Sequence, residues 1–189
     1  MNHPTPPPPA SRLRIEVLGT AHLHAYKALR DESLRCAPEA FTSDYATALQ
    51  RPAESYGARF GDPATGQFFL GAFDAGGQLL GSIGCEREER LQQRHCATVV
   101  GMMVAPNAQR GGIGRQLVQT CVEHAERVAG LEQLVLTVTA ANAHVVRLYE
   151  RAGFHAWGRL QRAVVIDGIG HDKLHMVRWL PASPLFRAA

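Results

Sequence analysis

Apolar and polar residues follow one another along this chain in patterns that predict strands and helices in turn. Short apolar runs at residues 99–104 and 134–138 have the length and β-branched content of buried strands. Between them, after residue 114, apolar residues recur along one side of a predicted helix: Leu117, Cys121 and Ala125, with Val118, Val122 and Ala129 beside them. A strand, a helix and a strand in this order predict a right-handed parallel crossover.

The segments on either side of this crossover predict antiparallel strands and further helices. Two apolar runs flank a turn-rich segment at residues 74–78 and predict a hairpin, and a second hairpin is expected with Asp167-Gly168 near its turn. We expect strands at residues 13–18, 67–73, 79–85, 164–169 and 174–177, and helical segments at residues 21–36, 44–50 and 53–60. The charged residues 86–94 are expected to form a loop.

A glycine-rich turn, Gln-Arg-Gly-Gly-Ile-Gly at residues 109–114, joins the first apolar run to the helix. Glycine lowers helix stability, so three glycines at a helix start indicate unusual backbone angles or the close approach of a ligand. The first N–H groups of a helix are unpaired and carry partial positive charge, which suits a phosphate. Because Arg110 and Arg115 flank the glycines, we predict that this turn holds a pyrophosphate.

Two common nucleotide-binding patterns do not match this turn. A Walker loop needs a lysine after its last glycine, where Arg115 follows Gly114, and the dinucleotide pattern needs a third glycine where Leu117 stands. The pattern Gln109-x-x-Gly112-x-Gly114 instead resembles the acetyl-CoA loop of the GCN5-related N-acetyltransferases, the GNAT superfamily. The simpler alternative is a strand-to-helix turn with glycine caps.

A second motif lies downstream, at the distance that the family requires. Residues 142–154 contain an Asn, a predicted short helix with Leu148-Tyr149, and then Gly153-Phe154, which is similar to the other motif of the same family. Two motifs in the correct order are far more specific than either alone.

The resemblance covers about residues 13–180 and is most specific over residues 99–154. It implies a fold of class α/β (α+β): a single domain with a mixed central sheet of about seven strands, helices on both faces, and a splayed parallel strand pair that binds acetyl-CoA. Backbone groups of Met103 and Val104 would contact the pantetheine and the thioester, Asn142 would hydrogen-bond the pantetheine arm, and Arg147 would reach a phosphate. The pyrophosphate would lie on Arg110, Gly111, Gly112, Ile113, Gly114 and Arg115.

The resemblance also suggests how the reaction proceeds. Acyl transfer to an amine needs a neutral amine, a stabilised oxyanion and a proton for the departing thiolate. A backbone N–H at Met103 or Val104 is the candidate oxyanion donor. Tyr149 matches the tyrosine of the family, and its phenol can supply the proton. The alternative for Tyr149 is core packing, since it shares a helical face with Val145 and Ala152.

The general base is left open by the sequence. Histone-type members of the family resemble this chain with a Glu at the position of Thr98, and ribosomal-protein N-terminal acetyltransferases with a Glu at the position of Thr137. Because both carboxylates are missing, a small primary amine or an amino acid is favoured as acceptor over a protein. The remaining candidates for the base are a water chain and the side chains of Glu86, Glu88, His95 and Asp172.

Composition sets the limits of this interpretation. The 189 residues, 46% hydrophobic and 20% charged, predict one domain at residues 13–189 after a proline-rich, disordered tail at residues 1–12. A net charge of +3 gives no argument for a nucleic-acid or membrane partner.

Four cysteines without C-x-x-C spacing favour reduced thiols and a cytoplasmic location. No metal is expected, because His22, His24, His171 and His175 lack partners for a ligand set and are interpreted as surface or packing residues.

The sequence therefore predicts an acetyl-CoA-dependent N-acetyltransferase that acts on a small-molecule amine in a ternary complex. A non-catalytic acyl-CoA-binding or regulatory module is one alternative, and a protein N-terminal acetyltransferase is another. The oligomeric state is left open, with a homodimer as one assembly.

Overall fold

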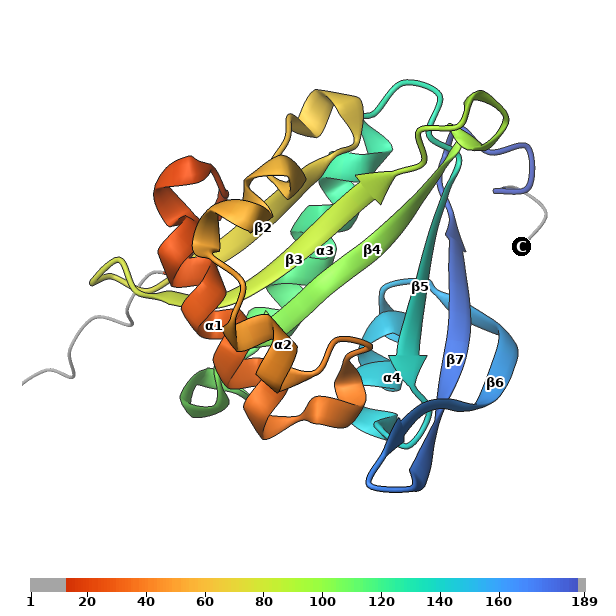
Figure 1. Ribbon diagram of the computed structural model, residues 1–189. Coiled ribbons are helices and arrows are strands. Elements are labelled where there is room, and N and C mark those ends of the chain that lie inside the picture. The colour runs from red at the N-terminus through yellow and green to blue at the C-terminus, as the bar shows by residue number, and fades with distance from the viewer. Residues whose placement is uncertain (1–12, 187–189) are drawn as a thin grey trace, which may run out of the picture.

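The structure, a computed structural model, describes residues 13–186, so the predicted tail at residues 1–12 lies outside the described residues. Its centre is a seven-stranded sheet in the order β1-β2-β3-β4-β5-β7-β6 (Figure 1). The strands are β1 (Arg14–Val17), β2 (Phe68–Phe73), β3 (Leu79–Arg87), β4 (Cys96–Val104), β5 (Gln133–Thr139), β6 (His155–Ile166) and β7 (Ile169–Trp179). Only β4 and β5 pair in parallel, so the expected mixed sheet of about seven strands is confirmed.

Helices cover both faces of this sheet, as expected (Figure 1). The α-helices are α1 (Leu23–Cys36), α2 (Tyr45–Leu49), α3 (Ile113–Glu126) and α4 (Ala143–Arg151). Short 3-10 segments are η1 (Thr20–His22), η2 (Pro38–Ala40), η3 (Ala53–Arg59), η4 (Pro63–Thr65), η5 (Leu91–Gln93) and η6 (Pro106–Ala108). Residues of α3 and α4 share one apolar cluster with Leu134 and Leu136 of β5, and Tyr26 of α1 and Tyr56 of η3 share another with Phe69 of β2. We call these two sides of the sheet the α3 face and the α1 face.

The two parallel strands pair only where they begin. Cys96, Ala97 and Thr98 of β4 lie opposite residues 133–135 of β5, and beyond these pairs the strands separate (Figure 1). The expected splaying of the pair is therefore confirmed. The gap widens toward the carboxyl ends of both strands, where α3 and α4 follow.

A β-bulge reverses the facing of side chains within β4. Its pairing with β3 shifts by one residue near Gly101, which has a φ of 58°. Before the bulge, Val99 packs on the α3 face and Val100 on the α1 face. After it, Met102 packs on the α3 face and Met103 on the α1 face. A single inserted residue thus changes which backbone groups the second half of β4 directs into the gap.

The observed elements differ from the predicted ones mainly in the last hairpin. Residues 164–169 are not one strand, because β6 ends at Ile166 and β7 begins at Ile169, with Asp167 and Gly168 in a tight turn at φ values of 48° and 80°. The start of β6 at residue 155 was not predicted, since its residues are mostly exposed and show no apolar alternation. The helical segment predicted at residues 53–60 is a 3-10 helix, Ala53–Arg59. The predicted loop at residues 86–94 begins with two residues of β3.

Candidate active site

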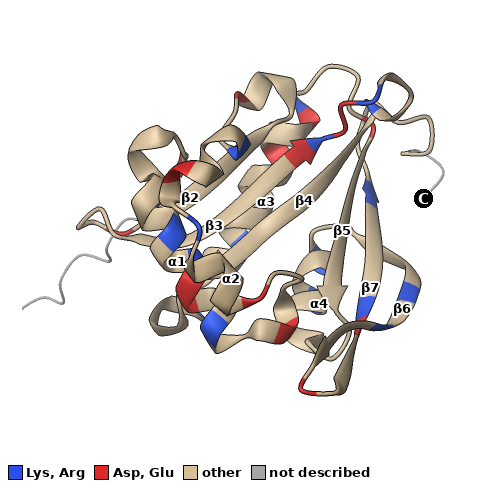
Figure 2. Cartoon of the chain, viewed as in Figure 1, with Lys and Arg blue, Asp and Glu red and all other residues tan. Residues whose placement is uncertain are grey.

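One edge of β4 is free where the central strands separate. On its other side β4 pairs with β3 as far as Val104 opposite Gly81, but toward β5 the pairing stops at Thr98. Neither β4 nor β5 contains a charged residue (Figure 2). The gap therefore presents backbone N–H and C=O groups without competing carboxylates, which suits a chain-like ligand with amide groups.

The glycine loop at the start of α3 adopts backbone angles that most residues avoid. Gly112 caps the helix with a φ of 77°, and Arg110 has a φ of 67°, a conformation that a non-glycine residue adopts at a cost of about 1–3 kcal/mol. A Cβ built at Gly112 would meet no atom within 4 Å. The N–H groups of the first helical turn have no partner within the helix. This open, exposed loop can accept an anion.

Gly114 has a different role, because it allows close packing. A Cβ at this position would lie 3.0 Å from Cε of Met102 in β4 and 3.4 Å from Cδ2 of Leu148 in α4. The first turn of α3 thereby fits against both neighbours. Near the same point the side-chain amide of Gln109 donates a hydrogen bond of 3.4 Å to the carbonyl oxygen of Val104. The loop is thus attached to the end of the free strand edge.

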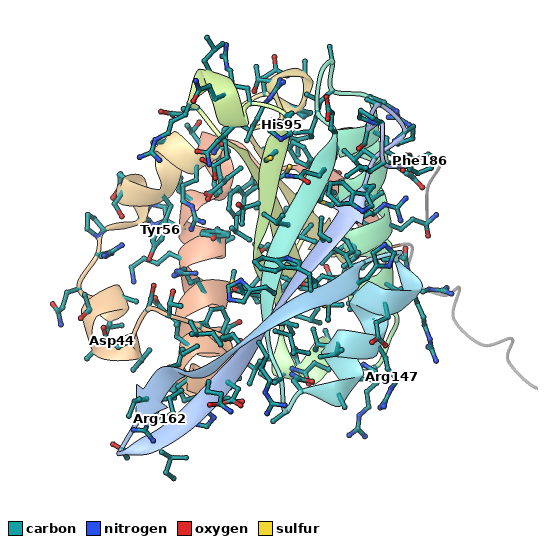
Figure 3. All side chains as sticks on the ribbon, turned by 90° about the vertical axis from the view of Figure 1, so that its right-hand side faces the viewer. Asp44, Tyr56, His95, Arg147, Arg162 and Phe186 are labelled. Carbon is teal, nitrogen blue, oxygen red and sulfur yellow. The ribbon has the colours of Figure 1, made fainter. Side chains whose placement is uncertain are left out.

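Asn142 begins α4 at the end of β5, across the gap from the glycine loop. Its side-chain oxygen accepts a hydrogen bond of 3.2 Å from the backbone N–H of Val145 and caps the helix. Because the oxygen is used in the cap, a contact of Asn142 with a ligand would come from the amide nitrogen. Arg147 is exposed and points away from α4 into solvent (Figure 3).

Tyr149 is 5% exposed and packs in the cluster of the α3 face. Its ring stands edge-on to Phe154 with centroids 5.6 Å apart. Burial, and after it the neighbouring Cys121, raises the pKa of the Tyr149 phenol above its ordinary value, so the hydroxyl keeps its proton at neutral pH. A protonated phenol can donate a hydrogen bond.

The four side chains considered as general base lie in different surroundings. Glu86 is beside Thr98 on the α1 face and forms an ion pair of 2.8 Å with Arg59. Asp172 accepts hydrogen bonds from the Arg162 backbone (2.9 Å) and the Arg159 side chain (2.8 Å) on the β6–β7 hairpin, and these lower its pKa.

The other two candidates lie at the closed end of the strand pair. His95 is exposed just before β4, at the opposite end of the molecule from Arg147 (Figure 3). The backbone N–H of Glu88 donates to the carbonyl of Cys96 in the same region. Of the four candidates, the structure therefore places only Glu86 on the α1 face next to the separating strands.

The structure places His175, which the sequence analysis interpreted as a surface or packing residue, close to the separating strands. His175 of β7 lies opposite Thr137 of β5, and two residues along β5 Thr139 donates a hydrogen bond of 2.8 Å to the carbonyl of Glu39 in η2. His175 and Thr137 therefore share the α1 face. Thr137 is exposed although it lies inside a central strand, so this face is uncovered there. The register of β7 against β5 places His175 beside Thr137, and this register cannot be predicted from the sequence.

A buried lysine attaches the segment after α1 to the far side of the gap. The ammonium of Lys173 donates to the carbonyls of Glu39 (3.0 Å) and Ala40 (2.9 Å) and to the Thr139 hydroxyl (2.9 Å). Burial lowers the pKa of Lys173. These bonds hold η2 over the end of β5, so the connection from α1 to α2 spans the α1 face of the gap (Figure 1).

Within the described part of the chain, no three His, Cys, Asp or Glu side chains come together as a metal site would require. None of the helices described there has both the length and the apolar character needed to cross a bilayer.

A mixed sheet whose central parallel strands separate beside a glycine loop is the arrangement of an acyl-CoA-binding acetyltransferase. The family model described as the acetyltransferase (GNAT) family matches residues 26–154. The chain belongs to the GNAT family, as the two sequence motifs indicated.

Solved structures with the same fold cover nearly the whole chain. A GCN5-related N-acetyltransferase from Kribbella flavida superposes with a TM-score of 0.75 at 25% identity, over 89% of this chain and 98% of its own. A putative acetyltransferase from Salmonella typhimurium, solved with acetyl-CoA, gives a TM-score of 0.74 at 22% identity, over 92% and 98% of the two chains. At 22% identity, the likeness to the Salmonella typhimurium structure shows the fold alone.

Similarity to curated proteins is restricted to shorter segments. A mycothiol acetyltransferase from Salinispora tropica is 36% identical over 89 residues, which are 47% of this chain and 29% of that protein. The [ribosomal protein bS18]-alanine N-acetyltransferase of Escherichia coli is 39% identical over 59 residues, which are 31% and 39% of the two chains. The match thus spans less than half of either relative, and their names do not define the acceptor of this protein.

Proposed function

We propose that the protein is an acetyl-CoA-dependent N-acetyltransferase that transfers the acetyl group directly to the primary amine of a small molecule or an amino acid, in a ternary complex. The single observation that carries the proposal is the free edge of β4 beside the open glycine loop of α3. This edge and this loop fit the two ends of one ligand, an amide-bearing arm and a diphosphate.

The residues named from the sequence take the following parts in the proposal. Backbone groups of Met103 and Val104 pair with the pantetheine arm, and one of their N–H groups stabilises the oxyanion. Asn142 donates from its amide nitrogen to the same arm. Arg147 and the two arginines of the glycine loop add positive charge. The pyrophosphate lies against the N–H groups of residues 110–115.

Tyr149 supplies the proton that the thiolate needs when the amine has attacked the thioester carbonyl. The phenol is protonated at neutral pH and can therefore donate to the thiolate, and burial, which raises its pKa, makes it a weaker acid than a phenol in water. The acceptor amine approaches from the α1 face, which is open at Thr137. We also assign the protein to the cytoplasm, and its four free cysteines support this assignment.

The absence of charged residues from β4 and β5 favours a small amine over a protein N-terminus, because the positions of Thr98 and Thr137 lack the carboxylates of the protein-modifying members. A module that binds acyl-CoA without turnover is the second candidate, favoured by the same absence.

Thiol release from acetyl-CoA, measured against a panel of amines, tests the proposed activity. We expect at least one class among polyamines, amino acids, aminoglycosides and N-terminal peptides to raise thiol release well above the rate of hydrolysis without acceptor. Stabilisation by acetyl-CoA without thiol release in any class would favour the non-catalytic module. Release restricted to N-terminal peptides would contradict the small-molecule assignment.

A further inference from the structure

Arg30 of α1 is a buried cation without a counter-ion. It is 9% exposed, its Nη2 donates a hydrogen bond of 3.1 Å to the hydroxyl of Ser43, and its Nε is buried without a partner. No carboxylate of residues 13–186 lies within 4.0 Å of its guanidinium. A guanidinium stays charged at any physiological pH, and an uncompensated buried charge is unfavourable.

The basic side chains around Arg30 are already neutralised. Lys27 of α1 forms an ion pair with Asp31, one turn along the same helix. Arg59 of η3 pairs with Glu86 and lies over the ring of Phe69, with its Cζ 4.8 Å from the ring centroid. Arg30 therefore leaves this region of the α1 face with one positive charge that the described side chains do not balance.

Two buried hydroxyl groups beside Arg30 also lack partners. The Tyr26 and Tyr56 hydroxyl oxygens are buried without hydrogen bonds, and their rings stand edge to face with centroids 5.4 Å apart. The Cζ of Arg30 lies 5.8 Å from the Tyr56 ring centroid, and Figure 3 shows Tyr56 extending from η3 toward α1. Buried polar groups in proteins almost always have partners, so the two hydroxyl groups and Nε of Arg30 together mark a place where a polar ligand or water can bind.

This cluster reaches the point where the central strands separate. A Cβ built at Gly101, in the bulge of β4, would lie 3.3 Å from the hydroxyl oxygen of Tyr26. Arg30, Tyr56 and Tyr26 thus form a continuous group from the interior of the α1 face to the bulge. Ser43 and Phe41, which contact Arg30 from the other side, belong to the connection between η2 and α2. These two residues cover the guanidinium on that side.

We propose that Arg30 binds a carboxylate of the acceptor, so that the substrate is a primary amine with a carboxylate a few bonds away, as in an amino acid. This inference rests on the proposed function and narrows its acceptor. A single guanidinium with hydroxyl donors balances the one negative charge of a carboxylate and matches its planar shape, whereas a phosphate dianion would remain half-balanced.

The test compares acceptors that differ only in the carboxylate. Amino acids and their carboxamides are assayed with the wild-type protein, with Arg30→Gln, and with Arg35→Gln as control, since Arg35 is an exposed arginine of the same helix. We expect wild type and Arg35→Gln to prefer the acids by about 30-fold or more in kcat/KM, and Arg30→Gln to lose that preference while it binds acetyl-CoA normally. Equal use of acids and carboxamides by the wild type would overturn the proposal, although the acetyltransferase function would stand.

A binding measurement separates this inference from the catalytic one. N-acetylated amino acids, the products of the reaction, should raise the melting temperature of the wild type but not of Arg30→Gln, and their methyl esters should stabilise neither. Stabilisation that is equal in both proteins would refute a role for Arg30 even if no amine were acetylated. Weaker binding of acetyl-CoA by folded Arg30→Gln would assign the guanidinium to the other ligand and refute it as well.

Discussion

Replacement of Gly112 by Asp is expected to weaken binding of acetyl-CoA by at least about 100-fold, about 2.7 kcal/mol. Gly112 caps α3 where the loop is open, and a Cβ there meets nothing within 4 Å. The aspartate side chain would occupy the space proposed for the pyrophosphate and would place a negative charge beside it. Isothermal titration calorimetry with acetyl-CoA measures the change.

Gly112→Asn is the matched control for this variant. Asparagine has nearly the same shape and also tolerates the left-handed backbone of position 112, but it carries no charge. We expect it to bind acetyl-CoA clearly better than Gly112→Asp, and both variants to have similar melting temperatures. Equal affinities of the two variants would remove the electrostatic part of the argument. Wild-type affinity in Gly112→Asp would show that the diphosphate lies elsewhere.

Replacement of Tyr149 by Phe is expected to lower kcat by about 100-fold with little change in the affinity for acetyl-CoA. Phenylalanine keeps the contact with Phe154 and the packing between α3 and α4, so only the proton donor is lost. Steady-state kinetics at saturating acceptor, together with calorimetry of acetyl-CoA binding, separate the two effects.

The melting temperature of Tyr149→Phe serves as the control for packing. Because phenylalanine keeps the buried ring and its contact with Phe154, we expect the melting temperature of the variant to stay close to that of the wild type. If Tyr149→Phe had the kcat of the wild type at saturating substrate, Tyr149 would have a purely structural role. A loss of activity accompanied by a lower melting temperature would point to the same conclusion.

The crossover and the glycine loop could be predicted from the sequence because local patterns determine them. The apolar runs of β4 and β5 and the helical spacing after Gly114 are visible within short windows. The closing hairpin was only partly predicted: β6 is mostly exposed, so its first residues show no alternation, although Asp167-Gly168 correctly marked its turn.

The residues of the α1 face could not be found in this way, because they come together only through long-range packing. Arg30, Tyr56 and Gly101 lie far apart in sequence and share no motif. The placement of His175 beside Thr137 depends on the register of β7 against β5. The roles of Met103, Asn142 and Arg147 remain predictions, since the structure gives their positions and not their ligand.

Thermal stabilisation by nucleotide ligands tests the central claim most directly, namely that the glycine loop and the free edge of β4 together bind acetyl-CoA. At about one hundred times its dissociation constant, acetyl-CoA should stabilise the protein by about 2.7 kcal/mol, while ATP and NAD at the same concentration should have no effect. No stabilisation by acetyl-CoA, or the same stabilisation by all three ligands, would contradict the account.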